Sequence, residues 1–259
     1  MNNKQRENPH ERTRYPDSLI RALYASRLAV IEALLRAIES ADSAARSHSE
    51  RVAAYCSLIG KQMGLGRGSL MTLKDGALLH DVGKIGLPRH ILGKQASLSE
   101  DEAMAMCAHV EYGTFVIEAT GLLSDIVPAL AQHHERYDGS GYPAGLCGES
   151  IHLHARIIAL ADAFDKLTGD YFNRRRTIDE ATVEIISGAG AHFDPEVVSA
   201  FLKVSKAEWL DPGWYAGSQF AADTEFDEPG IDEISELFGL DLDDVEDECP
   251  NRWPGLPYA

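Results

Sequence analysis

The sequence predicts an all-α fold built as a bundle of helices. Long segments carry apolar residues at intervals of three, four or seven, which is the spacing of an amphipathic helix. No segment shows a convincing alternation of apolar and polar residues, and no internal repeat is found. Histidine and aspartate residues recur on these segments beside the apolar stripes. We therefore expect a helical domain whose polar residues converge on one interior site.

The composition indicates a globular protein with an acidic tail. Of the 259 residues 44% are hydrophobic, and no apolar run approaches the roughly 20 residues that span a bilayer, so no membrane segment is expected. The formal net charge is −17. Thirteen acidic residues and no Lys or Arg lie between Asp223 and Glu248, and subtracting them leaves only −4 for the rest. General binding to long nucleic acids is therefore not expected, and a small anionic substrate held by metals and a few basic side chains stays open.

The termini and cysteines favour a protein of the reducing cytoplasm. The polar stretch from Met1 to Arg14 lacks the apolar core of a signal peptide and is expected to be disordered. No pair of cysteines has C-x-x-C spacing, which argues against a thiolate metal site or a disulfide scaffold. The four cysteines are scattered, at Cys56, Cys107, Cys147 and Cys249.

The first predicted helix runs from Pro16-Asp17-Ser18, a typical helix start, to about Ser40. Its apolar residues stand four or seven apart, and such a stripe packs into a core or forms the seam of a homodimer. The stripe consists of Leu19, Leu23, Val30, Leu34 and Ile38.

The next two predicted helices carry the first polar residues of interest. One contains His48 and ends at the Gly64–Gly66 break; the other continues through Lys84. On the second, Leu70, Leu73 and Ala77 share a face with three polar residues, namely His80, Asp81 and Lys84. Burying such a set without partners costs several kcal/mol. A metal ion held by His80 and Asp81 is the simplest compensation, and a capped helix end with a satisfied histidine is the alternative.

The remaining segments complete the domain. A capping box at Ser99–Glu102 opens a helix that contains His109, and a further helix runs from about Ser124 to His133-His134. The Gly- and Pro-rich stretch that follows is a predicted loop. The last helices are expected over about 153–167, over 178–187, and from Pro195 to near Lys206. We divide the chain into 1–14, an N-terminal helix at 15–40, a domain at 41–208, and an acidic, aromatic tail at 209–259.

Seven histidine and aspartate residues lie on or at the ends of five predicted helices. Any one of them could be a satisfied core residue, but together they suggest convergence on a common site. Neutral imidazoles with carboxylates suit Fe, Mn, Zn or similar metals, and a bundle core is a usual place for a two-metal site. Two metals can activate water and hold the oxygens of a phosphoryl displacement. The seven are His48, His80, Asp81, His109, His133, His134 and Asp162.

Six sequence motifs give this pattern a family resemblance. His48-x-x-Arg51-Val52 precedes the His80-Asp81-x-Gly83-Lys84 motif, and His133-His134-Glu135 leads into Asp138-Gly139-Ser140-Gly141-Tyr142-Pro143. Asp162-x-x-Asp165 and His192-Phe193-Asp194-Pro195 extend the match, which covers roughly residues 31 to 202. In order and spacing the chain resembles the HD-GYP family. The resemblance implies an HD-domain helical bundle with a C-terminal HD-GYP extension, here followed by the acidic tail.

The resemblance also implies a function: a metal-dependent phosphodiesterase that hydrolyses cyclic di-GMP to pGpG, in some members onward to GMP. The seven histidines and aspartates would bind two divalent ions, with Fe or Mn best suited. Asp81 would bridge the metals and hold a hydroxide that attacks phosphorus, and Lys84 would contact the scissile phosphate. The loop of Gly139, Gly141, Tyr142 and Pro143 would surround the site and dock GGDEF cyclase domains.

Several positions depart from the family pattern. Ala44 stands where some members have a carboxylate that admits a third metal, so two metals are expected. The segment Asp170–Arg174 loses the first of two family arginines but keeps the second, Arg174, which remains the expected phosphate contact of the Arg174–Arg176 turn. Arg89, Gln95 and Val110 also replace frequent family residues. These departures concern substrate contacts and leave the metal set intact.

Other interpretations stay open at this point. The protein could be a cyclic di-GMP receptor or an adaptor for a cyclase without turnover, or an HD hydrolase of another nucleotide. Asp165 could bind substrate or orient a metal ligand, and His192 is expected to pack or cap rather than bind metal. His152 and His154 are expected to be exposed. Within the tail, a short apolar stripe could dock on this domain or on a basic partner; it consists of Ile231, Ile234, Leu237 and Phe238.

Overall fold

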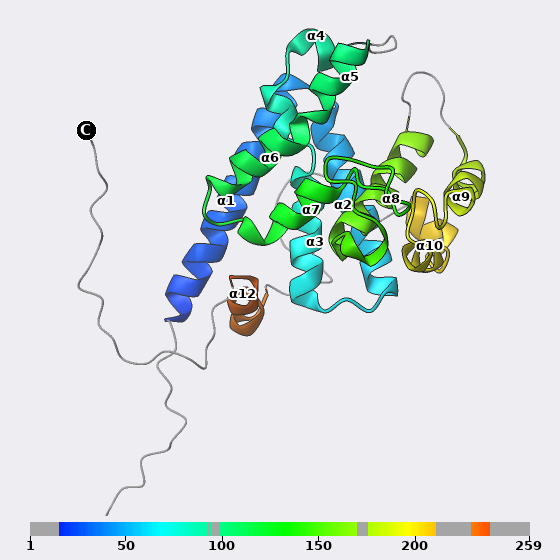
Figure 1. Ribbon diagram of the computed structural model, residues 1–259. Helices are drawn as coiled ribbons and strands as arrows, with labels where there is room; N and C mark the ends of the chain where they lie inside the picture. The colour runs from blue at the N-terminus through cyan, green and yellow to red at the C-terminus, as the bar shows by residue number, and fades with distance from the viewer. Residues whose placement is uncertain (1–15, 93, 95–98, 170–175, 211–228, 239–259) are drawn as a thin grey trace, which may run out of the picture.

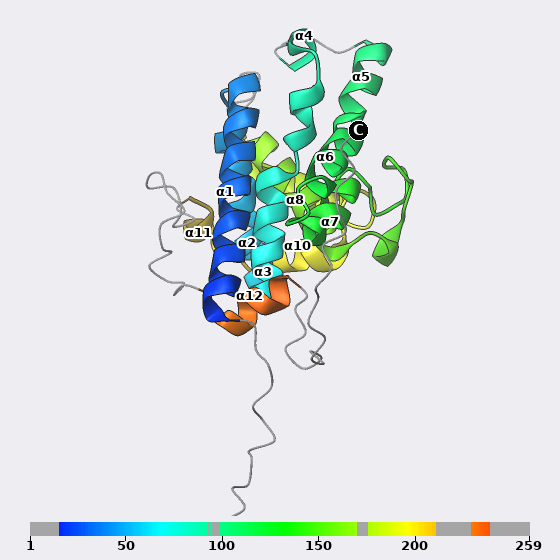
Figure 2. The same ribbon diagram turned by 90° about the vertical axis from the view of Figure 1, so that its left-hand side faces the viewer.

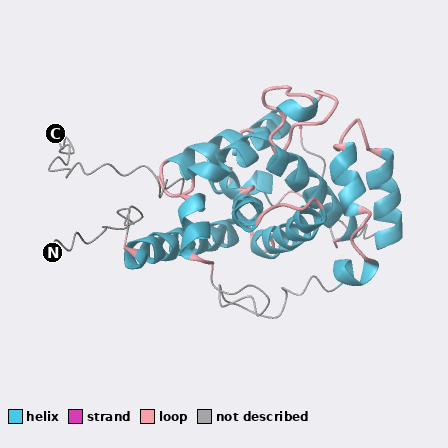
Figure 3. Cartoon of the chain, turned by 90° about the horizontal axis from the view of Figure 1, so that it is seen from below, coloured by secondary structure: helices cyan, strands magenta, loops and turns pink. Residues whose placement is uncertain are grey.

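The computed structural model describes residues 16–92, 94, 99–169, 176–210 and 229–238, and every regular element in these ranges is helical (Figure 3). The all-α prediction is therefore confirmed. The α-helices are α1 (Asp17–Ala41), α2 (Ala45–Gln62), α3 (Arg67–Leu79), α4 (Arg89–Leu92), α5 (Glu100–Cys107), α6 (His109–Glu118), α7 (Val127–Gln132), α8 (Leu153–Thr168), α9 (Ile178–Ser187), α10 (Pro195–Phe201), α11 (Lys206–Leu210) and α12 (Ile231–Leu237). Three 3₁₀ turns complete the set, η1 (Val82–Gly86), η2 (Ser124–Ile126) and η3 (Gly148–Ser150).

Helix α2 is the central element of the bundle (Figure 1). It packs against α3 on one side and α8 on the other, and α7 contacts both α8 and α3. Helix α6 lies against α7 and η1, and α1 covers α2, α3 and η1 (Figure 2). The core between these helices is aliphatic, with Val52, Leu78 and Ile157 fully buried. Helices from distant parts of the chain thus enclose one interior. None of the described helices combines the length and hydropathy needed to cross a bilayer.

An aromatic cluster anchors the C-terminal helices to this core. The ring of Phe164 on α8 lies 5.1 Å from that of Tyr55 on α2 and 4.9 Å from that of Trp209 on α11. Phe201 on α10 contacts both Phe164 and Trp209. Edge-on and tilted aromatic contacts of this kind stabilise a core beyond the area they bury. Trp209, the first residue of the predicted tail, therefore packs with the domain.

The N-terminal helix forms as predicted, but its most buried face is shifted from the predicted stripe, of which Val30 and Leu34 pack partly buried against the core. Its buried residues are Ile20, Arg27, Ile31, Leu35 and Ile38, so only Ile38 belongs to the predicted stripe, and Leu19 is 44% exposed. The reason is Arg27, whose fully buried guanidinium bonds Asp75 on α3 and Asp125 in η2. A stripe read from apolar residues alone omits such an arginine and is displaced by one residue, about 100° around the helix.

Some helices are shorter than predicted. The helix expected to continue through Lys84 ends at Leu79, and η1 follows after His80 and Asp81. The segment expected to be one helix around His109 is split into α5 and α6. Both breaks meet at Gly83, where a Cβ atom would overlap the His109 carbonyl oxygen. The close approach of η1 to α6 therefore requires a glycine at this position.

The tail places one helix on the domain. Helix α12 packs against α1 and α3, with Ile234 and Leu237 buried, as expected for docking of the apolar stripe. Glu233 on α12 also pairs with Arg67 at the start of α3, with 3.2 Å between the charged atoms. Predictions about residues 1–14, Gln95, the 170–174 segment and the other parts of the tail fall outside the described residues.

Candidate metal centre

The seven predicted ligands come together as two adjacent groups. Each group offers one donor atom per residue, and the donor atoms of a group all lie within 4.8 Å of one another. Six of the seven residues are buried and His134 is half-buried. The groups draw on α2, α8 and the ends of α3, α6 and α7, which is why the fold assembles them only as a whole. One group consists of Asp81, His109, His133 and His134, and the other of His48, His80 and Asp162.

Three of the histidines are oriented by the same kind of hydrogen bond to the backbone. The Nδ1 atoms of His80, His109 and His133 lie 2.7, 2.6 and 2.7 Å from the carbonyl oxygens three residues earlier. A ring that donates its Nδ1 hydrogen to a carbonyl presents the lone pair of Nε2 on its other side. Each of these imidazoles therefore aims Nε2 at the interior, in the form that binds metal.

The donor atoms are arranged in a way that calls for a cation. Among the described residues, the buried Nε2 of His80 has no hydrogen-bond partner. The Nε2 atoms of His109 and His133 face each other at 3.4 Å, although their Nδ1 hydrogens are committed to carbonyls. Two lone pairs in such contact repel, and unpartnered buried polar atoms are costly. Imidazole nitrogens with carboxylate oxygens form a set that suits a first-row divalent metal, so the residues fit metal binding.

Asp81 lies between the two groups. Its Oδ1 is 3.5 Å from Nε2 of His109, and its Oδ2 is 3.4 Å from Nε2 of His80. Burial would raise the pKa of this carboxyl, but Lys84 and His80 hold it well below the usual value. An ionised carboxylate with one oxygen toward each group is the arrangement that a bridging ligand needs.

Burial keeps one group of histidines neutral. It lowers the pKa of His109 and of His133, and it lowers the pKa of His134 to about 3, with like charges adding to the effect. His48 behaves differently. Burial alone would lower its pKa, but hydrogen bonds with Asp162 and Asp165 and nearby negative charge raise it to about 9. A divalent metal would therefore displace a proton from His48 near neutral pH.

Asp165 orients His48 from behind. Its Oδ2 lies 2.8 Å from Nδ1 of His48. Arg51 donates two hydrogen bonds to the same carboxylate, from Nε at 2.5 Å and from Nη2 at 2.8 Å. Burial opposes ionisation, yet the Arg51 and His48 hydrogen bonds lower the pKa of Asp165. A carboxylate behind an imidazole is the usual support for a metal-binding histidine. Of the two roles predicted for Asp165, the contacts favour orientation of a ligand.

Each ligand carboxylate also holds one lysine. The Nζ of Lys84 lies 2.5 Å from Oδ2 of Asp81, and the Nζ of Lys166 lies 2.5 Å from Oδ2 of Asp162. The Lys84 side chain is 25% exposed and that of Lys166 is 47% exposed, whereas both aspartates are buried. Two ammonium groups thus lie beside the ligand carboxylates, on side chains that are partly exposed to solvent.

The glycine-rich loop is fastened to the metal-binding segment. Buried Glu135 accepts hydrogen bonds from the Ala144 and Leu146 amides at 2.7 and 3.1 Å. A Cβ at Gly141 would overlap the backbone of residues 134–136, so only glycine allows this approach. The Tyr142 ring stacks on His134 with centroids 4.8 Å apart. The predicted partner loop, with its exposed Pro143 and half-buried Gly139, therefore also positions a ligand histidine.

Other predicted residues lie elsewhere. Arg174 falls outside the described residues, so its role stays a prediction. His192 is half-buried and stacks on Phe193 with centroids 4.2 Å apart, as expected for a packing residue. The expectation that His154 is exposed is wrong: it is buried and its Nε2 lies 2.9 Å from the Ser69 hydroxyl. His152 is half-buried, with Nδ1 accepting from the His154 amide at 3.3 Å.

Sequence reasoning quoted Arg51 and Glu135 within motifs but gave them no role, and it missed Lys166 entirely. Lys166 follows Asp162 by four residues on α8, the spacing at which opposite charges meet on a helix. The spacing of four residues between Asp162 and Lys166 was therefore the feature of the sequence from which this ion pair could have been predicted.

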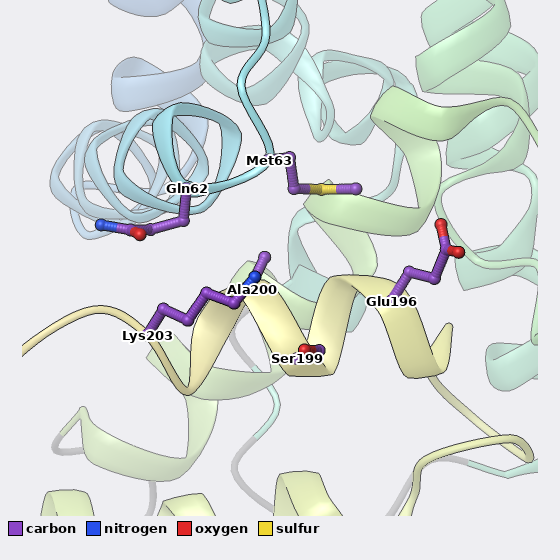
Figure 4. Close-up of a pocket in the computed structure, with 6 residues that line it drawn as sticks. All are labelled: Gln62, Met63, Glu196, Ser199, Ala200 and Lys203. Carbon is purple, nitrogen blue, oxygen red and sulfur yellow. The ribbon is translucent and has the colours of Figure 1, made fainter.

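A pocket of about 330 Å³ lies away from the metal groups, between the end of α2 and α10 (Figure 4). Gln62 and Met63 form one side, and Glu196, Ser199, Ala200 and Lys203 form the other. Gln62 is 14 residues beyond His48, or about 21 Å along the helix axis. None of the predicted ligands lines this pocket, so it is not part of the metal centre.

Comparisons with known proteins place this geometry in context. The model of the HD domain family matches residues 32–197. A cyclic di-GMP phosphodiesterase response regulator of Xanthomonas campestris is 39% identical over 66% of this chain and 46% of its own length. A 3'3'-cGAMP-specific phosphodiesterase of Vibrio cholerae is 35% identical over 66% of this chain and 33% of its own length. These likenesses confirm the resemblance drawn from the motifs.

A solved structure supports the fold. The crystal structure of a cyclic GMP-AMP phosphodiesterase from V. cholerae matches with a TM-score of 0.56 at 22% identity, over 72% of this chain and 50% of that chain. The chain spans half or less of the length of the curated relatives reported above. The family model, over residues 32–197, spans all seven residues of the two ligand groups.

Proposed function

This chain belongs to the HD domain family, and on that premise we propose that it is a metal-dependent phosphodiesterase that hydrolyses cyclic di-GMP to pGpG. The observation that carries the proposal is the meeting of all seven predicted ligands in two adjacent groups with Asp81 between them. Relatives named for cyclic di-GMP and for cGAMP support a cyclic dinucleotide as the substrate class.

The chain's own residues would divide the work in three ways. The two ligand groups would hold two divalent ions, Fe or Mn, which supply an activated water and stabilise negative charge on phosphate. Asp165 would hold the His48 ring in place, and Tyr142 would do the same for His134 by stacking. The aliphatic core beneath the site would exclude water from the side opposite to solvent.

Lys84 would act on the substrate directly. Its ammonium group lies at the boundary between Asp81 and solvent, where it can donate to a non-bridging oxygen of the scissile phosphate. Donation to that oxygen stabilises the charge that develops as the phosphodiester is cleaved. Arg174 stays the proposed second phosphate contact.

Turnover of cyclic di-GMP by metal-loaded protein, purified without oxygen, tests this function. We expect pGpG to form and Asp81→Ala to abolish it, because both ligand groups lose an oxygen. Asp179→Ala, which removes an exposed carboxylate on α9 that pairs with Lys206, should leave turnover unchanged. A rate with 3'3'-cGAMP that exceeds the cyclic di-GMP rate would reassign the substrate. Tight cyclic di-GMP binding with two bound metals and no product would contradict catalysis and favour the receptor interpretation.

A further inference from the structure

Lys166 forms an ion pair with one of the two carboxylate oxygens of Asp162. Its ammonium group lies 2.5 Å from Oδ2. The other oxygen, Oδ1, points inward, 3.2 Å from Nε2 of His48 and 3.9 Å from Nε2 of His80. Oδ1 is buried, and these two imidazole nitrogens are its neighbours. Lys166 therefore leaves one oxygen available to a metal while its charge stands beside the same carboxylate.

The charges around this group nearly cancel. Asp162 belongs to this group alone, and Asp81 turns its Oδ2 toward the same histidines, 3.4 Å from Nε2 of His80 and 3.8 Å from Nε2 of His48. Lys166 offsets the charge of Asp162, and Lys84 offsets that of Asp81. Asp165 stands behind His48, but its charge is offset by Arg51. Apart from Asp81, each group has three ligands of its own, and those of this group include the carboxylate that pairs with Lys166. A divalent cation entering it gains little Coulomb attraction and meets a nearby ammonium.

Resting on the proposed function, we propose that Lys166 weakens divalent-metal binding at the His48, His80 and Asp162 group and makes its full occupancy depend on a bound phosphate anion. A phosphate group brings the negative charge that the two cations and the lysine lack. Binding of the anion and of the second metal then favour each other, and by linkage the effect is reciprocal. The Lys166 side chain is 47% exposed, so an anion that enters from solvent can reach it.

Metal binding without turnover tests this directly. Mn²⁺ titrations of the metal-free full chain, followed by calorimetry and by Mn²⁺ electron paramagnetic resonance, report both sites. We expect one tight site and a second at least tenfold weaker, with inorganic phosphate tightening the second at least fivefold. In Lys166→Met the second site should bind Mn²⁺ at least tenfold more tightly without phosphate, and the phosphate effect should shrink.

Two variants serve as matched controls. Lys166→Arg keeps the positive charge and should behave as the unchanged protein. Lys206→Met removes an exposed lysine that bonds Asp179 at 2.7 Å, far in sequence from the ligands, and should also leave both isotherms unchanged. Circular dichroism checks that each variant is folded.

The outcomes separate this inference from the proposed function. Unchanged or weaker Mn²⁺ binding by folded Lys166→Met would overturn the role of Lys166. Altered phosphate binding with unchanged binding of Mn²⁺ alone would also overturn it, because Lys166 would then be only an anion contact. The predicted isotherms without any hydrolysis of cyclic di-GMP would support Lys166 and refute the phosphodiesterase proposal. Absence of Mn²⁺ binding by the unchanged protein would refute the metal centre itself.

Discussion

Replacing Asp165 with asparagine removes the charge that supports His48 while keeping the size of the side chain. The carboxylate now accepts from Nδ1 of His48 at 2.8 Å and is held by two nitrogens of Arg51. An asparagine cannot keep both contacts as strong charge-assisted bonds, so the imidazole loses its fixed orientation. Loss of such a support behind a metal ligand typically costs about 10- to 100-fold in metal affinity, or about 1.4 to 2.7 kcal/mol.

The loss should be confined to one of the two metals. We expect Mn²⁺ calorimetry of Asp165→Asn to show an unchanged tight site and a weakened site at the group that contains His48. Asp194→Asn is the matched control, because Asp194 is also buried and also bonds an arginine, Arg156, but touches no ligand histidine. Its isotherm should equal that of the unchanged protein.

A different result would refute this role for Asp165. If both Mn²⁺ ions bind Asp165→Asn as tightly as before while the KM for cyclic di-GMP rises, Asp165 contacts the substrate and does not orient His48. The comparison thus decides between the two roles that the sequence left open.

Three further predictions follow from the same contacts. In the metal-free protein the pKa of His48 is about 9, above the 6.5 of a free imidazole, so its stabilising charge is present below pH 6.5 and is lost as pH rises to 9. Urea unfolding in EDTA should show a loss of about 3 kcal/mol over that range, and an unchanged free energy would contradict it. Gly83→Ala should destabilise the protein by about 1–3 kcal/mol and weaken Mn²⁺ binding, because the added Cβ forces η1 away from α6. A variant that unfolds at the same temperature and binds Mn²⁺ as tightly as the unchanged protein would disprove the close approach. Arg27→Ala should lower the free energy of unfolding in urea by about 3–5 kcal/mol, because it leaves buried aspartate charge unpaired. Arg36→Ala, which breaks an exposed ion pair, should lower it by less than about 1 kcal/mol. Equal losses in the two variants would count against the buried cluster.

Helix content was predictable because apolar periodicity and local signals are properties of the chain itself. The capping boxes at Ser99 and Thr177 start helices through contacts between residues three apart in the sequence, and the helix over 178–187 has the predicted bounds. The end of α3 was not predictable in this way. It depends on Gly83 meeting the backbone of α6, a contact between segments that are distant in sequence.

The ligand set was predictable for a different reason. Histidine and aspartate at helix ends stand out in the sequence, and their motif spacing identifies a family. The supports behind the ligands were harder to foresee, because Arg51 and Lys166 resemble ordinary surface cations until the fold shows which carboxylate each one holds. The prediction of the buried face of α1 was inaccurate for the same reason, since the burial of Arg27 depends on Asp75 and on Asp125.

Anomalous diffraction from crystals of the Mn²⁺-loaded protein tests the central claim most directly. Two anomalous peaks are expected, one among Asp81, His109, His133 and His134 and one among His48, His80 and Asp162. The peaks should lie on either side of Asp81, with one carboxylate oxygen toward each. Peaks elsewhere in the molecule, or none after saturation with Mn²⁺, would contradict the metal centre and the phosphodiesterase function that depends on it.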